Sequence, residues 1–196
     1  MAAMKKAGRK AAKPRRTSPA AKAAQGEKVR VVFTEQKIRA RVREIAARLN
    51  REQGQRPVYV VSVLENAFVF TADLIRALKM PVYCSFVRAD IRDSVQGGVS
   101  TREITYTPSI NATGKDVVLV EGILQSGMTL DHLYRYLTGQ GPASLRTVVL
   151  VEKTDERKVD IPLDFVGFKA TGKFVVGYGL GHEGKFKNLP YIGKLG

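Results

Sequence analysis

The chain has 196 residues, of which 44% are hydrophobic, enough to bury a substantial core in one compact domain. Its formal net charge of +15 favours polyanionic partners. Cys84 is the only cysteine, and His132 and His182 are the only histidines, which excludes an internal disulfide and a cysteine-rich zinc site. The sequence has no run of about twenty apolar residues and no signal-peptide core, so we expect a cytoplasmic protein with no membrane contact.

Residues 1–28 differ in composition from the rest of the chain. They contain nine lysines and arginines and one acid, Glu27, which gives this segment a net charge of +8. With few bulky apolar side chains it cannot offset the entropy cost of ordering, so we predict a disordered basic arm. A solubilising tail is an equal alternative, whereas Pro14 and Pro19 argue against a helical transit peptide. The residues expected to contact a polyanion such as nucleic acid are Lys5, Lys6, Arg9, Lys10, Lys13, Arg15 and Arg16.

Residues 29–196 are predicted to form one α/β domain, which begins with an amphipathic helix. Thr34 can cap this helix, and Gly54 and Pro57 end it. The apolar positions at helical spacing are Ile38, Val42, Ile45, Ala46 and Leu49. The next elements in the chain are a buried strand at 58–64, a helix at 67–80 and a strand at 82–88.

The second half of the domain continues the alternation of strands and helices. Residues 89–101 are polar, contain two adjacent glycines and show no periodicity, so we expect a mobile loop. The β segments that follow are predicted at 102–106, 117–120, 145–151, 165–168 and 174–177. A helix opens at Thr129, after the strand at 117–120. This order predicts a mainly parallel sheet that is covered by helices on both faces.

The turn before Thr129 is the candidate ligand site. Ser126 and Thr129 supply hydroxyl groups, and Gly127 permits a positive φ, so successive N–H groups can converge on a phosphate at the helix N-terminus. The predicted phosphate-binding residues are Ser126, Gly127, Met128 and Thr129. An ordinary strand-to-helix loop is equally compatible with these residues.

Six segments in order resemble the hypoxanthine-guanine phosphoribosyltransferases, members of the type I phosphoribosyltransferase family: FVFTADLIRAL, VVLVEGILQSGMTL, LVEK, DFVGF, FVVGYGL and NLPYIGKL. The resemblance runs from about Val29 to Leu195. It implies a mainly parallel sheet flanked by helices, a small hood, and assembly into dimers or tetramers. Enzymes of this family transfer a 5-phosphoribosyl group from its pyrophosphate donor to a purine ring nitrogen and use Mg²⁺.

The sequence departs from the family pattern where the reaction is carried out. Gly122 stands where the resemblance implies a second carboxylate, and Gln125 stands where an aspartate handles the purine proton. An amide cannot accept that proton at neutral pH, and losing a catalytic base typically costs about two to four orders of magnitude in rate. The segment 89–101 also lacks the Ser-Tyr pair of the family's lid.

The same holds for the pyrophosphate side. Glu65 and Asn66 replace a basic residue and a glycine in the pyrophosphate-binding turn, and Gly181 replaces an aspartate of the Mg²⁺ site. Lys187 replaces an arginine, so it keeps the charge for a possible pyrophosphate contact but loses the bidentate fork. The sequence therefore predicts no catalytic residue and no metal ligand with confidence.

The nucleotide side is kept. By resemblance, Ser126, Gly127 and Thr129 match the 5′-phosphate cradle, and Glu121 accepts from a ribose hydroxyl. Lys153 matches the residue that donates to the purine 6-oxo group, Phe174 the ring that stacks on the base, and Val175 the backbone at the purine edge. The structural alternatives are a solvated strand-end charge for Lys153, a core aromatic for Phe174 and an unpaired loop acid for Glu121.

Three hypotheses follow. The first is a non-catalytic homologue that binds a purine nucleotide without a required cofactor, and acts as a sensor or regulatory protein, with nucleic-acid contacts through its arm. It would form homo-oligomers or pair with an active relative. The second is a purine phosphoribosyltransferase of low or altered activity in purine salvage, with Mg²⁺ held by Glu121 and substrate oxygens. The third is a scaffold in which the pocket is vestigial and the arm is the functional part.

Overall fold

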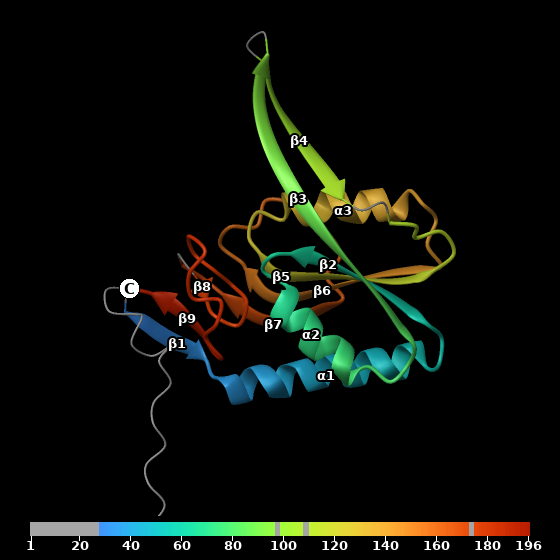
Figure 1. Ribbon diagram of the computed structural model, residues 1–196, viewed down its shortest axis with the longest axis horizontal. Helices are drawn as coiled ribbons and strands as arrows, with labels where there is room; N and C mark the ends of the chain where they lie inside the picture. The colour runs from blue at the N-terminus through green and yellow to red at the C-terminus, as the bar shows by residue number, and fades with distance from the viewer. Residues whose placement is uncertain (1–27, 97–98, 108–109, 173–174) are drawn as a thin grey trace, which may run out of the picture.

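The computed structural model describes residues 28–96, 99–107, 110–172 and 175–196 of the chain, so the predicted arm up to residue 27 lies outside the described residues. Within them, two sheets and three helices form the fold (Figure 1). The elements in order are β1 (Val29–Phe33), α1 (Glu35–Gln53), β2 (Val58–Leu64), α2 (Phe68–Ala77), β3 (Val82–Gln96), β4 (Val99–Thr107), β5 (Asp116–Leu124), α3 (Met128–Thr138), β6 (Ser144–Lys153), β7 (Phe165–Ala170), β8 (Val175–Val176) and β9 (Ile192–Leu195).

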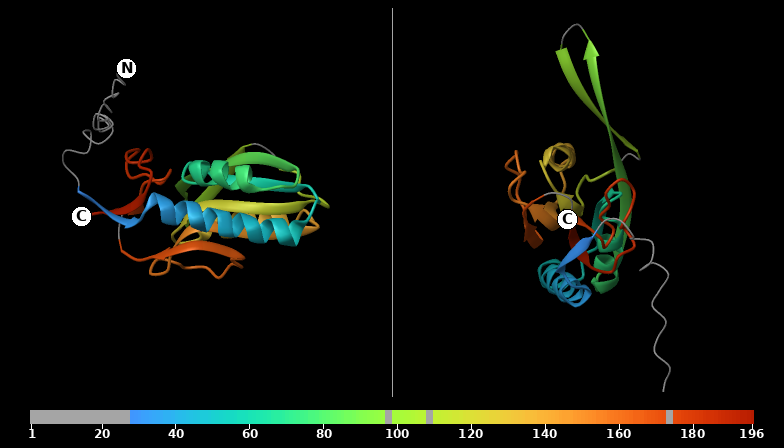
Figure 2. Two further views of the ribbon diagram at one scale, coloured as in Figure 1. Left: turned by 90° about the horizontal axis from the view of Figure 1, so that it is seen from below. Right: turned by 90° about the vertical axis from the view of Figure 1, so that its left-hand side faces the viewer.

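The large sheet has the strand order β4-β3-β2-β5-β6-β7, and all neighbours are parallel except the antiparallel pair β3 and β4. Helices α1 and α2 cover one face, and α3 covers the other (Figures 1 and 2). The predicted mainly parallel sheet flanked by helices is therefore confirmed. None of the described helices combines the length and the apolar character needed to cross a membrane.

Two apolar clusters form the core, one on each face of this sheet. Ile38 of α1 and Phe70 of α2 are fully buried in the first cluster, and Leu133 of α3 is fully buried in the second. Strands β2 and β5 contribute to both clusters, because successive side chains of a strand point to opposite faces. This double burial explains why their sequences are continuous apolar runs.

Helix α1 forms as its sequence predicts. The Thr34 side chain accepts a hydrogen bond from the Lys37 N–H, and Gly54 ends the helix with a positive φ of 64°. All five predicted apolar positions are buried. Helix α2 ends at Ala77, earlier than the predicted 80, and Leu78 already has extended backbone angles.

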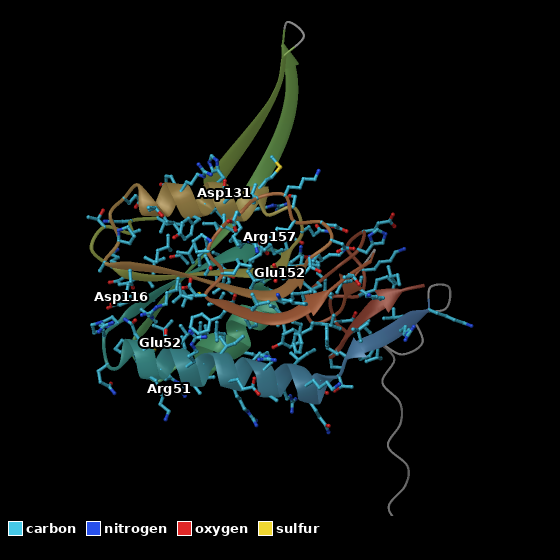
Figure 3. The ribbon with its side chains drawn as sticks, turned by 180° about the vertical axis from the view of Figure 1, so that it is seen from behind. Arg51, Glu52, Asp116, Asp131, Glu152 and Arg157 are labelled. Carbon is cyan, nitrogen blue, oxygen red and sulfur yellow. The ribbon has the colours of Figure 1, made fainter. Side chains whose placement is uncertain are left out.

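The amino-terminal edge of the large sheet is held by a polar network centred on Asp116 (Figure 3). Its carboxylate accepts hydrogen bonds from Gln53 (2.9 Å), Arg56 (3.1 Å) and Ser144 (2.5 Å). The Ser144 hydrogen bond, followed by those from Gln53 and Arg56, lowers the pKa of Asp116 against the effect of partial burial. This network ties α1, β5 and β6 together at the edge opposite the candidate site.

The prediction of a mobile loop at 89–101 is wrong for most of its length. Strand β3 continues to Gln96 and β4 begins at Val99, and the two pair as an antiparallel hairpin that projects from the body (Figures 1 and 2). Backbone hydrogen bonds hold a hairpin ladder together, so strands form there without an apolar pattern. The polar composition was therefore a poor guide to its backbone conformation.

The small second sheet joins the two ends of the described chain. Strand β9 lies between β1 and β8, with Val29 opposite Leu195 and Val175 opposite Lys194. It corresponds to the small hood that the resemblance implied. The segment between β8 and β9 reaches the loop after β2, where a Cβ on Gly179 would lie 3.4 Å from the Asn66 carbonyl oxygen. The hood thus places residues 177–189 beside the carboxyl ends of the large-sheet strands.

Candidate functional site

The candidate site lies at the carboxyl ends of β2 and β5, where parallel α/β sheets bind ligands. A hollow of about 200 Å³ opens there. Residues that line it include Leu64, Asn66, Glu121, Gln125, Ser126 and Thr129. The structure therefore brings the predicted phosphate-binding and ribose-binding residues together beside the loop that follows β2.

The phosphate turn, residues 125–129, leads directly into α3. Gly127 has φ 82°, and a Cβ at this position would lie 2.7 Å from the Val159 side chain. Met128 begins the helix, and its N–H donates to the Ser126 hydroxyl over 3.5 Å. Free N–H groups and a positive dipole at the start of an α-helix favour an anion. The turn thus offers two hydroxyls and a helix N-terminus to a phosphate, and only glycine fits at its tightest point.

Glu121 is buried, with 8% of its surface exposed, and it is not the unpaired loop acid of the structural alternative. Its Oε1 accepts hydrogen bonds from the N–H groups of Gly122 (2.8 Å) and Ile123 (3.4 Å). Burial raises the pKa of Glu121 to about 7, although the two hydrogen bonds act in the opposite direction. Near neutral pH this carboxyl group is therefore divided between its charged and neutral forms.

Gly122 has no room for any side chain. A Cβ built on it would lie 2.3 Å from the Asn66 carbonyl oxygen and 2.9 Å from the Ala67 nitrogen, both backbone atoms. Such distances are far below van der Waals contact. The backbone of residues 66–67 thus packs directly on Gly122, where the family pattern places a carboxylate.

Glu65 in the loop after β2 and Lys187 in the hood form an ion pair. The Lys187 Nζ lies 2.5 Å from Glu65 Oε2, and Arg88 approaches the same carboxylate at 4.0 Å. The hydrogen bond from Lys187, then its charge and that of Arg88, lower the pKa of Glu65. The peptide bond between Leu64 and Glu65 is cis. Lys187, the possible pyrophosphate contact, is therefore already bound to a carboxylate of the chain itself.

Gly181 belongs to the same cluster of contacts. A Cβ on Gly181 would lie 2.7 Å from Cε and 3.0 Å from Cγ of Lys187. The Lys187 stem therefore occupies the space beside this position, where the family pattern has an aspartate. Four of the positions that depart from that pattern, Glu65, Asn66, Gly122 and Gly181, contact one another directly or through Lys187.

Lys153, the predicted purine contact, is 1% exposed at the end of β6 and is not a solvated strand-end charge. Its ammonium group forms an ion pair with Glu156, which the sequence interpretation missed. The sequence clue to this pair is an acid three residues after the lysine that ends the strand. A turn brings the two side chains together, in which the Glu156 N–H donates to the Lys153 carbonyl. Glu156 lines a second hollow of about 550 Å³ together with Gln125 and Ser126.

Val175 and Phe174 are the other two residues that the resemblance assigns to the purine side. Val175 lies in β8, buried in the small sheet, and its contact with a purine edge stays a prediction. Phe174, the predicted stacking ring, lies outside the described residues.

The chain alone does not supply a complete Mg²⁺ site here, and a bound ion would need substrate oxygens in addition to Glu121. Mg²⁺ binds through one or two carboxylates together with substrate phosphates and water. Glu121 is the carboxylate that lines the first hollow, and one of its oxygens already accepts two backbone hydrogen bonds. Within the described part of the chain, no three His, Cys, Asp or Glu side chains gather closely enough to hold a metal ion.

Comparison with known proteins agrees with this geometry. The family model for phosphoribosyl transferase domains matches residues 31–182. The hypoxanthine-guanine phosphoribosyltransferase of Aquifex aeolicus is 35% identical over 168 residues, which span 85% of this chain and 94% of that protein. The Bacillus subtilis enzyme of the same name is 34% identical over 168 residues, 85% of this chain and 92% of that protein.

Solved structures give the same result. A hypoxanthine-guanine phosphoribosyltransferase of Bacillus anthracis superposes with a TM-score of 0.76 at 31% identity, over 87% of this chain and all of that one. A Trypanosoma cruzi hypoxanthine phosphoribosyltransferase, solved as a complex with the product IMP, gives a TM-score of 0.73 at 33% identity, over 87% and 85% of the two chains. The chain therefore belongs to the phosphoribosyltransferase family and is a homologue of the hypoxanthine-guanine phosphoribosyltransferases.

Proposed function

We propose that this chain is a non-catalytic homologue that binds a purine nucleoside monophosphate and acts as a sensor or interaction protein. The observation that carries the proposal is that the chain's own groups fill the space around Gly122 and Lys187, where the resemblance implies pyrophosphate binding. Asn66 backbone atoms pack on Gly122, and Glu65 neutralises Lys187. A leaving pyrophosphate would meet a carboxylate and a closely packed loop where it needs cations and space.

The opposite half of the site supports binding. Ser126, Gly127 and Thr129 lie at the N-terminus of α3, and Glu121 lines the same hollow, where it could accept from the ribose of a bound nucleotide. Lys153 is held at the end of β6, where its ammonium group can donate to a 6-oxo purine once it shares or releases Glu156. The T. cruzi relative was solved with IMP, a ligand of this class.

A sensor needs more than a binding site. A nucleotide shifts an equilibrium only if it binds one conformation or assembly better than another. In this proposal the second interaction is with an acidic partner, for which the basic arm supplies the charge. The arm then contacts phosphates without reading bases.

The experiment that tests the proposal combines a binding and a turnover measurement on the full chain. Calorimetry with IMP, GMP and AMP should give binding to at least one of them without added Mg²⁺. A steady-state assay with phosphoribosyl pyrophosphate and hypoxanthine, guanine or xanthine should give no product above background. Absence of heat with every nucleotide removes the ligand from the proposal, and rapid Mg²⁺-dependent product formation removes the non-catalytic role.

The second candidate is phosphoribosyl transfer of low or altered activity, and one observation favours it. Although Gln125 replaces the proton-handling aspartate, the Glu156 carboxylate lines the same hollow as Gln125. A carboxylate in that place could accept the purine proton instead. If turnover is found, its loss in Glu156→Gln with nucleotide affinity retained would support this candidate over the first.

A further inference from the structure

The helix α1 carries an excess of positive charge that the nucleotide site does not use. It has six cationic residues against three glutamates: Lys37, Arg39, Arg41, Arg43, Arg48 and Arg51 against Glu35, Glu44 and Glu52. Some of these cations are neutralised on the helix surface, for example Arg41 by Glu44 at 3.0 Å. Arg43 forms no ion pair within the described part of the chain and is exposed.

Three arginines line a groove between α1 and α2. These two helices cover the sheet face opposite to α3 (Figure 2). This cationic groove is a hollow of about 480 Å³ lined by Arg39, Val42, Arg43, Asp73, Arg76 and Ala77. The side chains of Arg39 and Arg76 are 64% and 80% exposed, and they pair with Glu35 at 2.6 Å and with Asp73 at 3.5 Å. Because both pairs are exposed to solvent, a phosphate can compete for these guanidinium groups. Asp73 is the acid in the groove, and its Oδ2 already accepts from the Tyr178 hydroxyl at 2.6 Å. The residues that line the groove therefore carry a net charge of +2, which becomes +1 when Glu35, the partner of Arg39, is included.

The cationic groove continues into an apolar hollow of about 490 Å³, because Arg39 and Asp73 line both. Its apolar walls are Phe68, Val69, Leu189 and Pro190. Phe68, the first residue of α2, is 42% exposed. An exposed aromatic ring in the hollow that Arg39 also lines offers a stacking surface near the phosphate contacts.

This pairing of charge and aromatic surface is typical of proteins that bind single-stranded nucleic acid. Their positively charged groove follows the backbone, and aromatic side chains stack on successive bases. We propose that the α1–α2 face binds single-stranded nucleic acid, with Arg39, Arg43 and Arg76 on the phosphates and Phe68 stacked on a base. A second copy of the chain would bring another positive groove, so charge complementarity favours the polyanion.

The chain order adds to this. Strand β1 leads directly into α1, so in the sequence residues 1–28 come shortly before the helix that carries the cationic groove. The nine cations of that segment and the groove can therefore act on one strand of nucleic acid. The inference shares its ligand with the proposed role of the arm, and it does not depend on the nucleotide site.

The test uses the full chain and two triple variants of equal charge. Arg39→Gln, Arg43→Gln and Arg76→Gln together remove the cations of the groove. Lys37→Gln, Arg51→Gln and Arg135→Gln together remove three cations outside it, where Arg51 points away from the body (Figure 3) and Arg135 lies on α3. Fluorescence anisotropy with a single-stranded oligoadenylate at several salt concentrations measures affinity and its salt dependence.

We expect the groove variant to lose at least about tenfold in affinity and to show a shallower salt dependence, since each lost phosphate contact lowers that slope by about one. The control variant should lose about threefold or less. Phe68→Ala should weaken binding to the single strand about tenfold and leave binding to duplex nearly unchanged. Equal losses in the two triple variants, or a monomer–dimer shift in the groove variant alone, would overturn the inference.

These outcomes separate the groove from the other proposals. Loss of all binding on removal of the arm, with no effect of the groove variant, rejects the groove and keeps the arm. Unchanged IMP or GMP affinity in the groove variant shows that it is folded. A failure of nucleotide binding in the unmodified chain leaves the groove measurement interpretable.

Discussion

The Lys187 ammonium group lies 2.5 Å from the Glu65 carboxylate, although the two residues are far apart in the sequence. The ion pair joins the hood to the loop after β2, two segments to which only the resemblance assigns a pyrophosphate contact. Considered alone, Glu65 would repel an anion and Lys187 would attract one. In the ion pair their charges neutralise each other, and the lysine side chain also packs on Gly181.

Breaking this pair should restore an anion site. In Glu65→Gln the Lys187 ammonium loses its carboxylate and becomes available, so we expect affinity for inorganic pyrophosphate to rise about tenfold. Isothermal calorimetry at low ionic strength measures this. Glu183→Gln is the matched control, because Glu183 pairs with Lys185 at 3.9 Å and is similarly exposed. Equal pyrophosphate affinity in the two variants would show that the ion pair does not block the site.

Reinstating the missing carboxylate should fail for a steric reason. In Gly122→Asp the new Cβ meets the Asn66 carbonyl oxygen, a backbone atom that cannot move away cheaply. We expect the variant to lose about 2–4 kcal/mol of unfolding free energy, as overpacked buried sites do, and to gain no transferase activity. Gly139→Ala is the control, because a Cβ there would meet its nearest neighbour at 3.5 Å. Urea unfolding gives both values, and a fully stable Gly122→Asp variant would contradict the packing argument.

The sequence predicted the fold well wherever a pattern is local. The β-branched run at 58–64 and the helical spacing after Thr34 are burial signals that a few neighbouring residues carry, and both elements have the expected bounds. Strands β1 and β9 were missed because their pairing, Val29 with Leu195, joins the ends of the domain and each is short. The strands at 82–88 and 102–106 were predicted, but their extension into 89–101 and their antiparallel pairing were missed, because backbone pairing there does not need an apolar pattern.

The site was predictable to the same degree. Ser126, Gly127 and Glu121 lie where the strand–turn–helix pattern places them, since the turn is a local feature. The contact between Gly122 and Asn66 was not predictable, because a glycine in sequence does not reveal which backbone approaches it. Likewise, the sequence shows that Gly181 replaces an aspartate, but it does not show that the Lys187 side chain occupies the space beside it.

The buried Glu121 should make stability depend on pH. Its pKa is about 7 in the folded chain against an ordinary value of 4.5, so below pH 4.5 both states are protonated and the fold keeps its full stability. As pH rises from 4.5 to 7 the unfolded chain ionises first, and we expect about 3 kcal/mol to be lost. Glu121→Gln should remove that loss, so the unfolding free energy of the variant should rise relative to that of the unmodified chain between pH 4 and pH 8. Parallel unfolding curves for the two proteins would contradict this.

The same carboxyl group should couple nucleotide binding to protons. Ribose hydroxyls donate more strongly to the ionised form, so IMP or GMP affinity should rise as pH increases through 7, and binding near this pH should release a proton. Calorimetry in two buffers of different ionisation enthalpy measures that release. In Glu121→Gln the difference between the buffers should vanish. A difference that persists would assign the proton to another group.

Removing residues 1–27 should separate the two proposed ligands. The deletion removes eight of the nine lysines and arginines of residues 1–28 and leaves Lys28. Affinity for nucleic acid should therefore fall by about tenfold or more, with a shallower salt dependence. The nucleotide site is built from residues after 60 and should keep its IMP or GMP affinity. Anisotropy and calorimetry on the same preparation measure the two effects. Unchanged nucleic-acid affinity would leave the segment without that role.

The Lys153–Glu156 pair distinguishes a structural lysine from a purine contact. Lys153→Met keeps an apolar stem of similar length in the buried position and removes the donor, so IMP and GMP should bind about ten- to hundredfold more weakly. AMP has an amino group where these ligands have the oxo group, so its affinity should not fall and is the internal control. Lys169→Gln, an exposed lysine 3.8 Å from Glu152, is the matched variant and should leave all three affinities unchanged. If IMP, GMP and AMP weaken equally in Lys153→Met, the lysine acts by holding the Glu156 turn in place, because only a direct contact to the 6-position can tell an oxo group from an amino group.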